Sequence, residues 1–184
     1  MTGGLASKIL SLHAALEVAA LPHAFGGAFA LAYCTDEPRG TKDIDVNVFV
    51  GLDRIEELVA ALPAEIEVTP SDRAALARDG QTRLWWDGTP VDVFLSNHPF
   101  HDHAEASARA VPFAGIDDLP VLACADLAVF KAFFARAKDA VDVATMVAAG
   151  TVDLSHLRRT VTALLGDGER DRFFARVEDA LTDP

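Results

Sequence analysis

The sequence predicts a mixed α/β fold in which a helix-flanked sheet is followed by a helical lobe. Alternating, β-branched runs such as Ile44–Val50 recur within the first 120 residues and are typical of half-buried strands. Helical apolar spacing separates these runs and continues alone through the last third of the chain. The 184 residues suit one domain. We therefore expect residues 1–120 to form the core and residues 121–184 to form a helical lobe packed on it as one compact unit.

Local signals justify each element in turn. Leu5–Leu21 carries an apolar stripe at helical spacing and ends before Pro22. Ser71 is the expected N-cap of a short helix. Asp87-Gly88 is a turn of the kind that joins two hairpin strands. In chain order, we expect helices over 5–21, 28–34, 52–62, 71–78, 125–134, 138–149, 154–165 and 169–181, and strands over 23–25, 44–50, 65–69, 83–86 and 91–95.

Charge and cysteine usage limit the classes of function. The net charge of −12 argues against a general nucleic-acid binder, because phosphate contacts are largely electrostatic. Cys34 and Cys124 lie far apart and form no metal-ligand spacing, so both are expected to be buried thiols of a reduced protein. No window approaches the roughly 20 apolar residues of a membrane span. We expect a soluble, cytoplasmic protein that makes no membrane contact.

Two carboxylates begin the strand at residue 44. Successive side chains of a strand alternate faces, so Asp43 and Asp45 point the same way, with Cα atoms roughly 6.5 Å apart. At 4 Å and an effective dielectric constant near 20, such a pair repels by about 4 kcal/mol. A cation must neutralise it. Arg39 and Lys42 could do so in a surface cluster, or a hard divalent ion such as Mg²⁺ could bind the oxygens.

A third acid and a glycine pair add to this pattern. Asp92 stands between two valines in a later strand, and lies either on a solvated face or in a site. Gly26-Gly27 precedes a helix, where bare backbone amides favour phosphate oxygens, although a glycine pair is also an ordinary tight turn. Three carboxylates could hold two metal ions, or hold one and leave Asp92 to take a proton.

This arrangement resembles the DNA polymerase β-like nucleotidyltransferase superfamily. In that superfamily a glycine pair opens a helix, a strand carries a D-x-D motif, and a later strand carries a third acid. The corresponding residues here are Gly26, Gly27, Asp43, Asp45 and Asp92. The resemblance implies a nucleotidyltransferase fold, with a mixed sheet flanked by helices and a helical C-terminal lobe.

Two further segments narrow the resemblance to the AbiEii/MenT-type nucleotidyltransferase toxins. The segment 39–46 is similar to the family's local motif, and residues 22–50 are especially similar to the smaller mycobacterial MenT toxins. The segment 126–143 looks like the family's downstream helix, in which Lys131 and Asp139 match positions needed for activity. The resemblance spans roughly residues 23–147.

The resemblance implies a role for each matched residue. Asp43, Asp45 and Asp92 would bind one or two Mg²⁺ ions, with Asp92 also helping to activate the acceptor hydroxyl. Lys131 would contact a phosphate or the nucleotide. Asp139 would also be a catalytic residue. Lys131 lies in an apolar run, where a lysine needs an anionic partner or a path to water. The NTP-binding residues would be Gly26, Gly27, Arg39, Thr41 and Lys42.

Three functions remain open. The resemblance implies a toxin of a toxin–antitoxin system that transfers NMP from an NTP to the 3′ acceptor end of tRNA and blocks translation. Such a toxin would have a cognate antitoxin protein or kinase. Alternatively, the acceptor is a hydroxyl of a protein or of an aminoglycoside-like small molecule, which an acidic surface suits. The third possibility is an inactive fold that serves as a binding partner.

Other residues have weaker signals. The spacing of His98, His101 and His103 fits no standard zinc signature, so a polar loop near the site is expected. Of Trp85 and Trp86, one should lie in the core and one at a rim, where it could stack on a base. Five arginines are expected either on solvated helix faces or on a surface that binds a nucleic acid: Arg158, Arg159, Arg170, Arg172 and Arg176.

Overall fold

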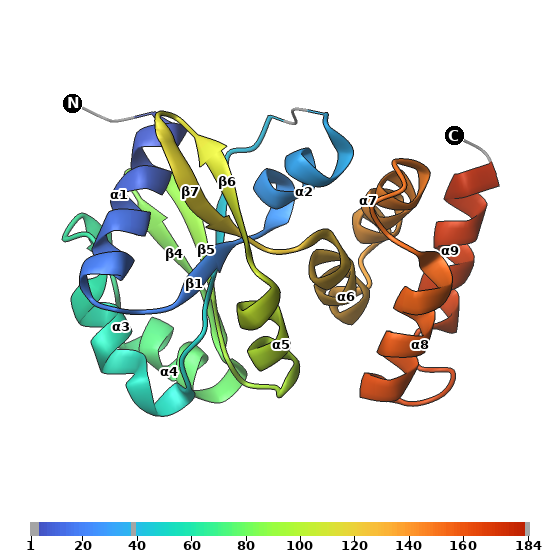
Figure 1. Cartoon of the computed structure of the whole chain (residues 1–184). Helices are drawn as coiled ribbons and strands as arrows, with labels where there is room; N and C mark the ends of the chain where they lie inside the picture. The colour runs from blue at the N-terminus through green and yellow to red at the C-terminus, as the bar shows by residue number, and fades with distance from the viewer. Residues whose placement is uncertain (1–3, 38–39, 183–184) are drawn as a thin grey trace. The chain divides into compact units, whose positions relative to one another are not determined.

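The computed structural model describes residues 4–37 and 40–182, and within them the chain divides into two compact units (Figure 1). The first unit comprises Met1–Phe29 and Gly40–Leu122, and the second comprises Ala30–Arg39 and Ala123–Pro184. The chain therefore leaves the first unit within helix α2 (Gly27–Thr35) and returns to it before the D-x-D strand.

The first unit is built on a mixed sheet. In the described part of the chain this sheet has seven strands in the order β3-β4-β5-β2-β1-β7-β6. The pairs β2–β5 and β1–β7 are parallel and the other neighbours are antiparallel. The expected α/β fold is confirmed. The strands are β1 (His23–Phe25), β2 (Ile44–Val48), β3 (Ile66–Glu67), β4 (Gln81–Trp86), β5 (Thr89–Leu95), β6 (Arg109–Phe113) and β7 (Ile116–Val121).

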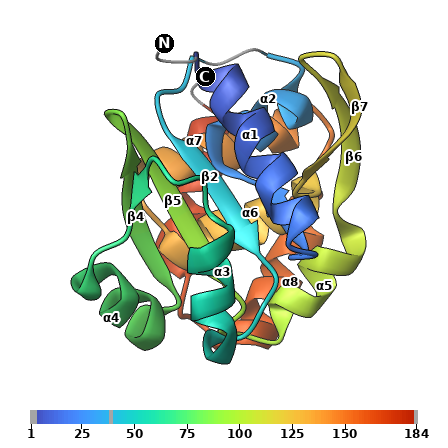
Figure 2. The same ribbon diagram turned by 90° about the vertical axis from the view of Figure 1, so that its left-hand side faces the viewer.

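One face of the sheet is apolar. Its central strands bury Ile44, Val46, Val91 and Val93 at alternate positions. α1 lies beside α3 over the sheet (Figure 2). Lys8 on α1 donates hydrogen bonds to the Trp86 carbonyl and the Thr89 hydroxyl, where β4 and β5 meet. The first-unit helices are α1 (Leu5–Val18), α3 (Ile55–Ala61, after a 3₁₀ turn at Leu52–Arg54), α4 (Pro70–Asp79) and α5 (Phe100–Ser107).

The structure corrects two expectations for these elements. Thr69, not Ser71, caps α4, because Pro70 suits the first helical position and Asp72 completes a capping box with Thr69. α5, β6 and β7 fall in a stretch for which no element was expected. Pro112 and a register shift interrupt β6, and these weaken its strand pattern.

The second unit is helical. α6 packs against α7 and α8, and α7 packs against α9. The helices are α6 (Cys124–Phe134), α7 (Ala137–Ala148), α8 (Leu154–Leu165) and α9 (Asp171–Thr182). Its core buries Val143, Met146, Leu157, Phe174 and Val177. Among the described residues, every helix falls short of the length or the apolar character that a membrane crossing demands.

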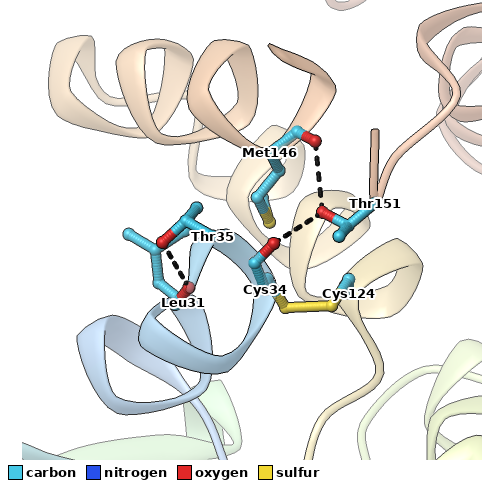
Figure 3. Close-up of a disulfide and its surroundings, with 6 residues drawn as sticks. All are labelled: Leu31, Cys34, Thr35, Cys124, Met146 and Thr151. Carbon is cyan, nitrogen blue, oxygen red and sulfur yellow. Dashed lines mark hydrogen bonds between the residues drawn. A yellow bond between two sulfur atoms is a disulfide. The ribbon is translucent and has the colours of Figure 1, made fainter. Parts of the chain in front are cut away.

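A disulfide joins two parts of the second unit. Cys34 of α2 and Cys124 of α6 are bonded, with Cα atoms 5.6 Å apart (Figure 3). The Thr151 hydroxyl contacts the Cys34 carbonyl at 2.9 Å and the Met146 carbonyl at 3.1 Å beside the bridge. The expectation of two reduced thiols is wrong. The cysteines are 90 residues apart in sequence, so their proximity depends on the fold and could not be predicted from local patterns.

Candidate active site

A row of polar side chains crosses three neighbouring strands. Asp45 on β2 pairs in register with Asp92 on β5, and Asp92 pairs with Arg83 on β4. Paired residues share a face of the sheet, and the flanking Ile44 and Val91 are buried on the opposite face. The structure thus brings the predicted acids Asp45 and Asp92 together on the polar face.

Arg83 contributes a positive charge to this row. Its Nε and Nη2 donate to the two carboxylate oxygens of Asp92, each at 2.7 Å, and its Nη2 lies 3.7 Å from Asp43 Oδ2. Hydrogen bonding to Asp92 raises the pKa of Arg83 well above its ordinary value. Asp92 is the least exposed of these ionic groups, with 18% of its side chain accessible. A strand neighbour therefore supplies one of the positive charges that the three carboxylates require.

Two basic residues were expected to neutralise the acids. Arg39 lies outside the described residues, and Lys42 is exposed. The Thr41 hydroxyl contacts the backbone of Asp43, at 3.3 Å from its nitrogen and 3.2 Å from its oxygen. Thr41 thus braces the segment that carries the first acid.

The glycine pair meets the same row of side chains. The Gly26 amide donates to the Asp45 carbonyl at 2.9 Å, and Gly27 opens α2 with a φ of +55°. A Cβ at Gly27 would collide with Asp45 Oδ2. Only glycine tolerates both the left-handed backbone and this close approach. The N-terminal amides of α2 therefore begin directly beside the Asp45 carboxylate.

An acidic cleft adjoins Arg83. It has a volume of about 480 Å³, and four acids and one arginine contribute to its wall. Trp85 is 54% exposed and Trp86 only 6%, which confirms that one lies at a rim and one in the core. Hydrogen bonds from Thr69 lower the pKa of Asp72, so this carboxylate is charged at neutral pH. The lining residues are Glu65, Glu67, Thr69, Ser71, Asp72, Arg83, Leu84, Trp85 and Asp87.

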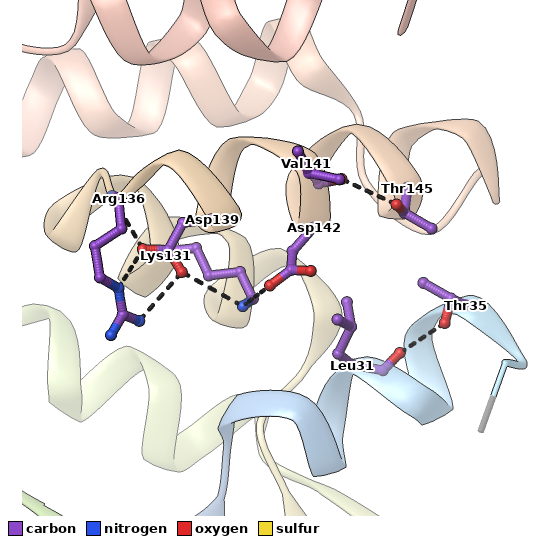
Figure 4. A network of polar contacts seen from close by, with 8 residues as sticks. All are labelled: Leu31, Thr35, Lys131, Arg136, Asp139, Val141, Asp142 and Thr145. Carbon is purple, nitrogen blue, oxygen red and sulfur yellow. Dashed lines mark hydrogen bonds and ion pairs between the residues drawn. The ribbon is translucent and has the colours of Figure 1, made fainter. Parts of the chain in front are cut away.

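Lys131 and Asp139 belong to the second unit, where they form a buried ionic cluster (Figure 4). Lys131 Nζ lies 2.7 Å from Asp142 Oδ2 and 3.7 Å from Asp139 Oδ1. Arg136 binds Asp139 through Nε at 2.7 Å and Nη2 at 3.1 Å. Lys131 thus has the anionic partner that its apolar surroundings require. The catalytic role implied for Lys131 and Asp139 stays a prediction.

The three histidines after β5 do not converge on one point. His101 is buried on α5, and its Nδ1 contacts the His98 carbonyl at 3.0 Å. His98 Nδ1 accepts from the Phe100 amide at 3.1 Å, and His103 is exposed. Burial lowers the pKa of His101. His98 and His101 thus contact each other and the first turn of α5, in a stretch where a polar loop was expected.

Arg83 was the site residue that sequence reasoning missed. The signal lay in the Asp87-Gly88 turn, whose two residues have φ values of +44° and +75°. A two-residue hairpin loop fixes the register of the strands beside it. Counting outward from the turn pairs Arg83 with Asp92, as observed.

Comparison with known proteins identifies the fold. No protein-family profile and no curated protein matches the sequence. The solution structure of the antibiotic-resistance factor ANT(2'')-Ia is similar, with a TM-score of 0.63, 14% identity and 95% of each chain covered. The crystal structure of ANT(2'')-Ia in complex with adenylyl-2''-tobramycin has a TM-score of 0.48, 16% identity and 94% of each chain covered. JHP933 from Helicobacter pylori has a TM-score of 0.46 and 12% identity over 96% of this chain and 88% of that one. The chain therefore has the mixed α/β fold of nucleotidyltransferases.

Proposed function

We propose that this protein is a magnesium-dependent nucleotidyltransferase that moves NMP from an NTP to an acceptor hydroxyl. The observation that carries the proposal is the row formed by Arg83, Asp92 and Asp45, which ends beside Gly27 at the start of a helix. This row combines carboxylates, an opposing cation and helix amides on one face of one sheet.

The carboxylates suit a hard divalent ion. Asp43 and Asp45 offer oxygen donors only, and Asp92 supplies a third carboxylate in register with Asp45. Arg83 is the cation paired with Asp92, which leaves the cluster anionic. We assign Asp43 and Asp45 as the ligands that hold the ion, with Asp92 at its edge. A bound Mg²⁺ would offset the negative charge of the α-phosphate and of the attacking oxygen.

Gly27 explains why a phosphate would need that ion. The first amides of α2 favour a phosphate oxygen, but the Asp45 carboxylate lies against the same glycine. A phosphate and a carboxylate this close repel unless a cation lies between them. Helix amides and carboxylates together are therefore more specific for a metal-bound triphosphate than either is alone.

We assign to Asp92 the role of taking the proton of the acceptor hydroxyl. Arg83 donates to both of its oxygens, which fixes the orientation of the carboxylate. A carboxylate has about four lone-pair sites, so two hydrogen bonds leave room for a proton. Asp92 is thus the proposed general base, and Arg83 the residue that positions it.

The acidic cleft favours a cationic acceptor. Glu65, Glu67, Asp72 and Asp87 line it against the single cation Arg83, and the exposed ring of Trp85 offers an apolar wall. We therefore propose a hydroxyl-bearing, polycationic small molecule of the aminoglycoside kind as the acceptor. ANT(2'')-Ia, described as an antibiotic-resistance factor, has the same fold.

A tRNA 3′ end is the second candidate acceptor. It is supported by the resemblance of segments 39–46 and 126–143 to the AbiEii/MenT-type toxins, and would bring a cognate antitoxin as partner. Two of the arginines that could hold a nucleic acid are engaged within the second unit. Arg158 pairs with Glu178 at 2.6 Å, and Arg170 donates to carbonyls at the end of α6. The net charge of −12 also disfavours a polyanion.

Transfer of label identifies both substrates. The protein is incubated with Mg²⁺ and each α-labelled NTP, with either total tRNA or a panel of aminoglycosides as acceptor. The proposal expects label on an aminoglycoside, lost in Asp43→Asn/Asp45→Asn and kept in the matched surface double variant Asp117→Asn/Asp118→Asn. Label on tRNA selects the second candidate. Failure to bind any NTP with Mg²⁺ leaves a binding-partner role and overturns the enzyme.

Because the proposed reaction consumes an NTP, we expect it to take place in the cytoplasm. That compartment keeps most protein thiols reduced. Cys34 and Cys124 would then meet reductant during the life of the protein, so the bridged and dithiol forms should both be assayed.

A further inference from the structure

A second cluster of ligand-type side chains lies in the first unit, at the other end of β1 from the glycine pair. His13 and Glu17 are one helical turn apart on α1, so they share a face, and His23 opens β1. One donor atom from each of the three lies within 4.8 Å of the others. His23 is buried, His13 is half-buried and Glu17 is exposed, so an ion can enter from solvent.

The hydrogen bonds of His23 determine which of its nitrogens is available. Its Nδ1 lies 2.9 Å from the Leu21 carbonyl, which can only accept, so Nδ1 carries the proton. Nε2 therefore presents a lone pair, and it points at His13 Nδ1 at 2.9 Å. A second ring nitrogen bound to a backbone carbonyl is the usual arrangement of a metal-ligating histidine.

We propose that His13, Glu17 and His23 form a binding site for a transition-metal ion, Zn²⁺ foremost, distinct from the carboxylate site. Two imidazoles and one carboxylate are an established zinc donor set, with a fourth position left for water. Imidazole nitrogens do not suit Mg²⁺, so the two sites select different metals. This proposal is independent of the proposed enzymatic activity.

The geometry needs only small adjustments. Two nitrogens bound to one tetrahedral zinc at about 2.05 Å are about 3.3 Å apart, a few tenths of an ångström beyond the observed 2.9 Å between His13 and His23. The exposed side chain of Glu17 can rotate to close the third side. Binding moves the His13 proton from Nδ1 to Nε2 and requires no net loss of a proton from either ring.

Bound zinc would join the end of α1 to the start of β1. The turn between them includes Ala20, which has a φ of +53°. Because the ion binds the folded arrangement, it should raise the melting temperature as its concentration increases.

The test is zinc binding to the full chain in an Asp43→Asn/Asp45→Asn background, which removes the competing carboxylate site. Competition with a chromophoric chelator should give one zinc per chain. His13→Gln and Glu17→Gln should each weaken binding roughly 10-fold or more, because even residues that only orient ligands are worth about that much. Bound Co²⁺ should show the visible bands of a tetrahedral site, and the zinc-dependent rise in melting temperature should disappear in both variants.

The matched controls are His156→Gln and Glu105→Gln, which alter exposed residues elsewhere and should leave zinc affinity unchanged. The substituted positions His13 and Glu17 are not fully buried, so both variants should fold, as circular dichroism can verify. Zinc that binds equally to all variants lies elsewhere and overturns the proposal. Absence of binding at a large excess of zinc leaves a hydrogen bond between two histidines and overturns it too.

Discussion

Arg83 donates hydrogen bonds to both carboxylate oxygens of Asp92, each at 2.7 Å. This arginine therefore affects any metal ion that the carboxylates would bind. The same guanidinium lies 3.7 Å from Asp43. It therefore contributes positive charge to the place where a divalent ion would bind.

Removing that charge should strengthen Mg²⁺ binding. We expect Arg83→Gln to bind Mg²⁺ roughly 30-fold more tightly, since two unit charges 4 Å apart in water interact by about 1 kcal/mol and Mg²⁺ carries two charges. Nucleotidyl transfer should fall, because Asp92 loses the group that orients it. Calorimetric titration without nucleotide measures the first effect. Arg78→Gln, which removes a surface pair with Asp79, is the control, and equal Mg²⁺ affinity in both variants would contradict the expectation.

Gly27 should tolerate no side chain. Gly27→Ala adds a Cβ where Asp45 Oδ2 lies and also strains a backbone with φ of +55°. Gly88→Ala has similar strain, at φ of +75°, but no atom lies within 4 Å of its Cβ. Each should lose about 1–2 kcal/mol of stability from the backbone. Only Gly27→Ala should also weaken Mg²⁺–NTP binding, as titration calorimetry can show; equal losses would disprove the role of the close approach.

Variants of Lys131 distinguish a structural role of this residue from a catalytic one. Lys131→Ala removes the cation 2.7 Å from the buried Asp142, while Asp139 keeps Arg136, and should cost about 3–5 kcal/mol in urea unfolding. Lys138→Ala, at an exposed position on the next helix, should stay within about 0.5 kcal/mol. The double variant Lys131→Met/Asp142→Leu should recover much of the stability. If it is stable and active, the catalytic role implied for Lys131 is wrong.

Reduction of the disulfide should destabilise the chain. The bridge closes a loop with a sequence separation of 90 residues, and removing such a link typically costs about 2–4 kcal/mol. Urea unfolding with and without dithiothreitol measures the difference. Cys34→Ala/Cys124→Ala should behave like the reduced protein and should not respond to the reductant. An unchanged midpoint on reduction of the wild type would show that the link adds nothing.

Acid should destabilise the first unit through His101. Burial lowers its pKa below the ordinary value of 6.5, so the unfolded chain takes up the proton first as the pH falls. The stability it contributes is complete above about pH 6.5 and decreases below it. In a metal-free buffer, His101→Gln should flatten this part of the pH profile, while the exposed His103→Gln should not. His98 and Asp102 are the charged neighbours that modulate the effect.

The polar face of the sheet could be predicted because it depends on local rules. Alternation along a strand places Asp43 and Asp45 on one side. The two-residue hairpin turn fixes the register that pairs Arg83 with Asp92. Both signals act over fewer than ten residues.

The rest depends on contacts distant in sequence. The bond between Cys34 and Cys124 exists because α2 continues into the second unit, which no periodicity reveals. The meeting of His13 with His23 requires the chain to reverse through Ala20, a non-glycine residue with positive φ. Such a turn carries no strong composition signal, so the cluster could be recognised only in three dimensions.

The bridge between Cys34 and Cys124 also makes most of the sheet part of a covalent ring. Strands β2 to β7 all lie between the two cysteines, whereas β1 precedes them. A protease that cuts any loop inside the ring would open it without releasing a fragment. Such a nicked chain would migrate as one species on a gel without reductant and as two pieces with it. The arrangement can therefore hide proteolytic damage from any assay run under oxidising conditions.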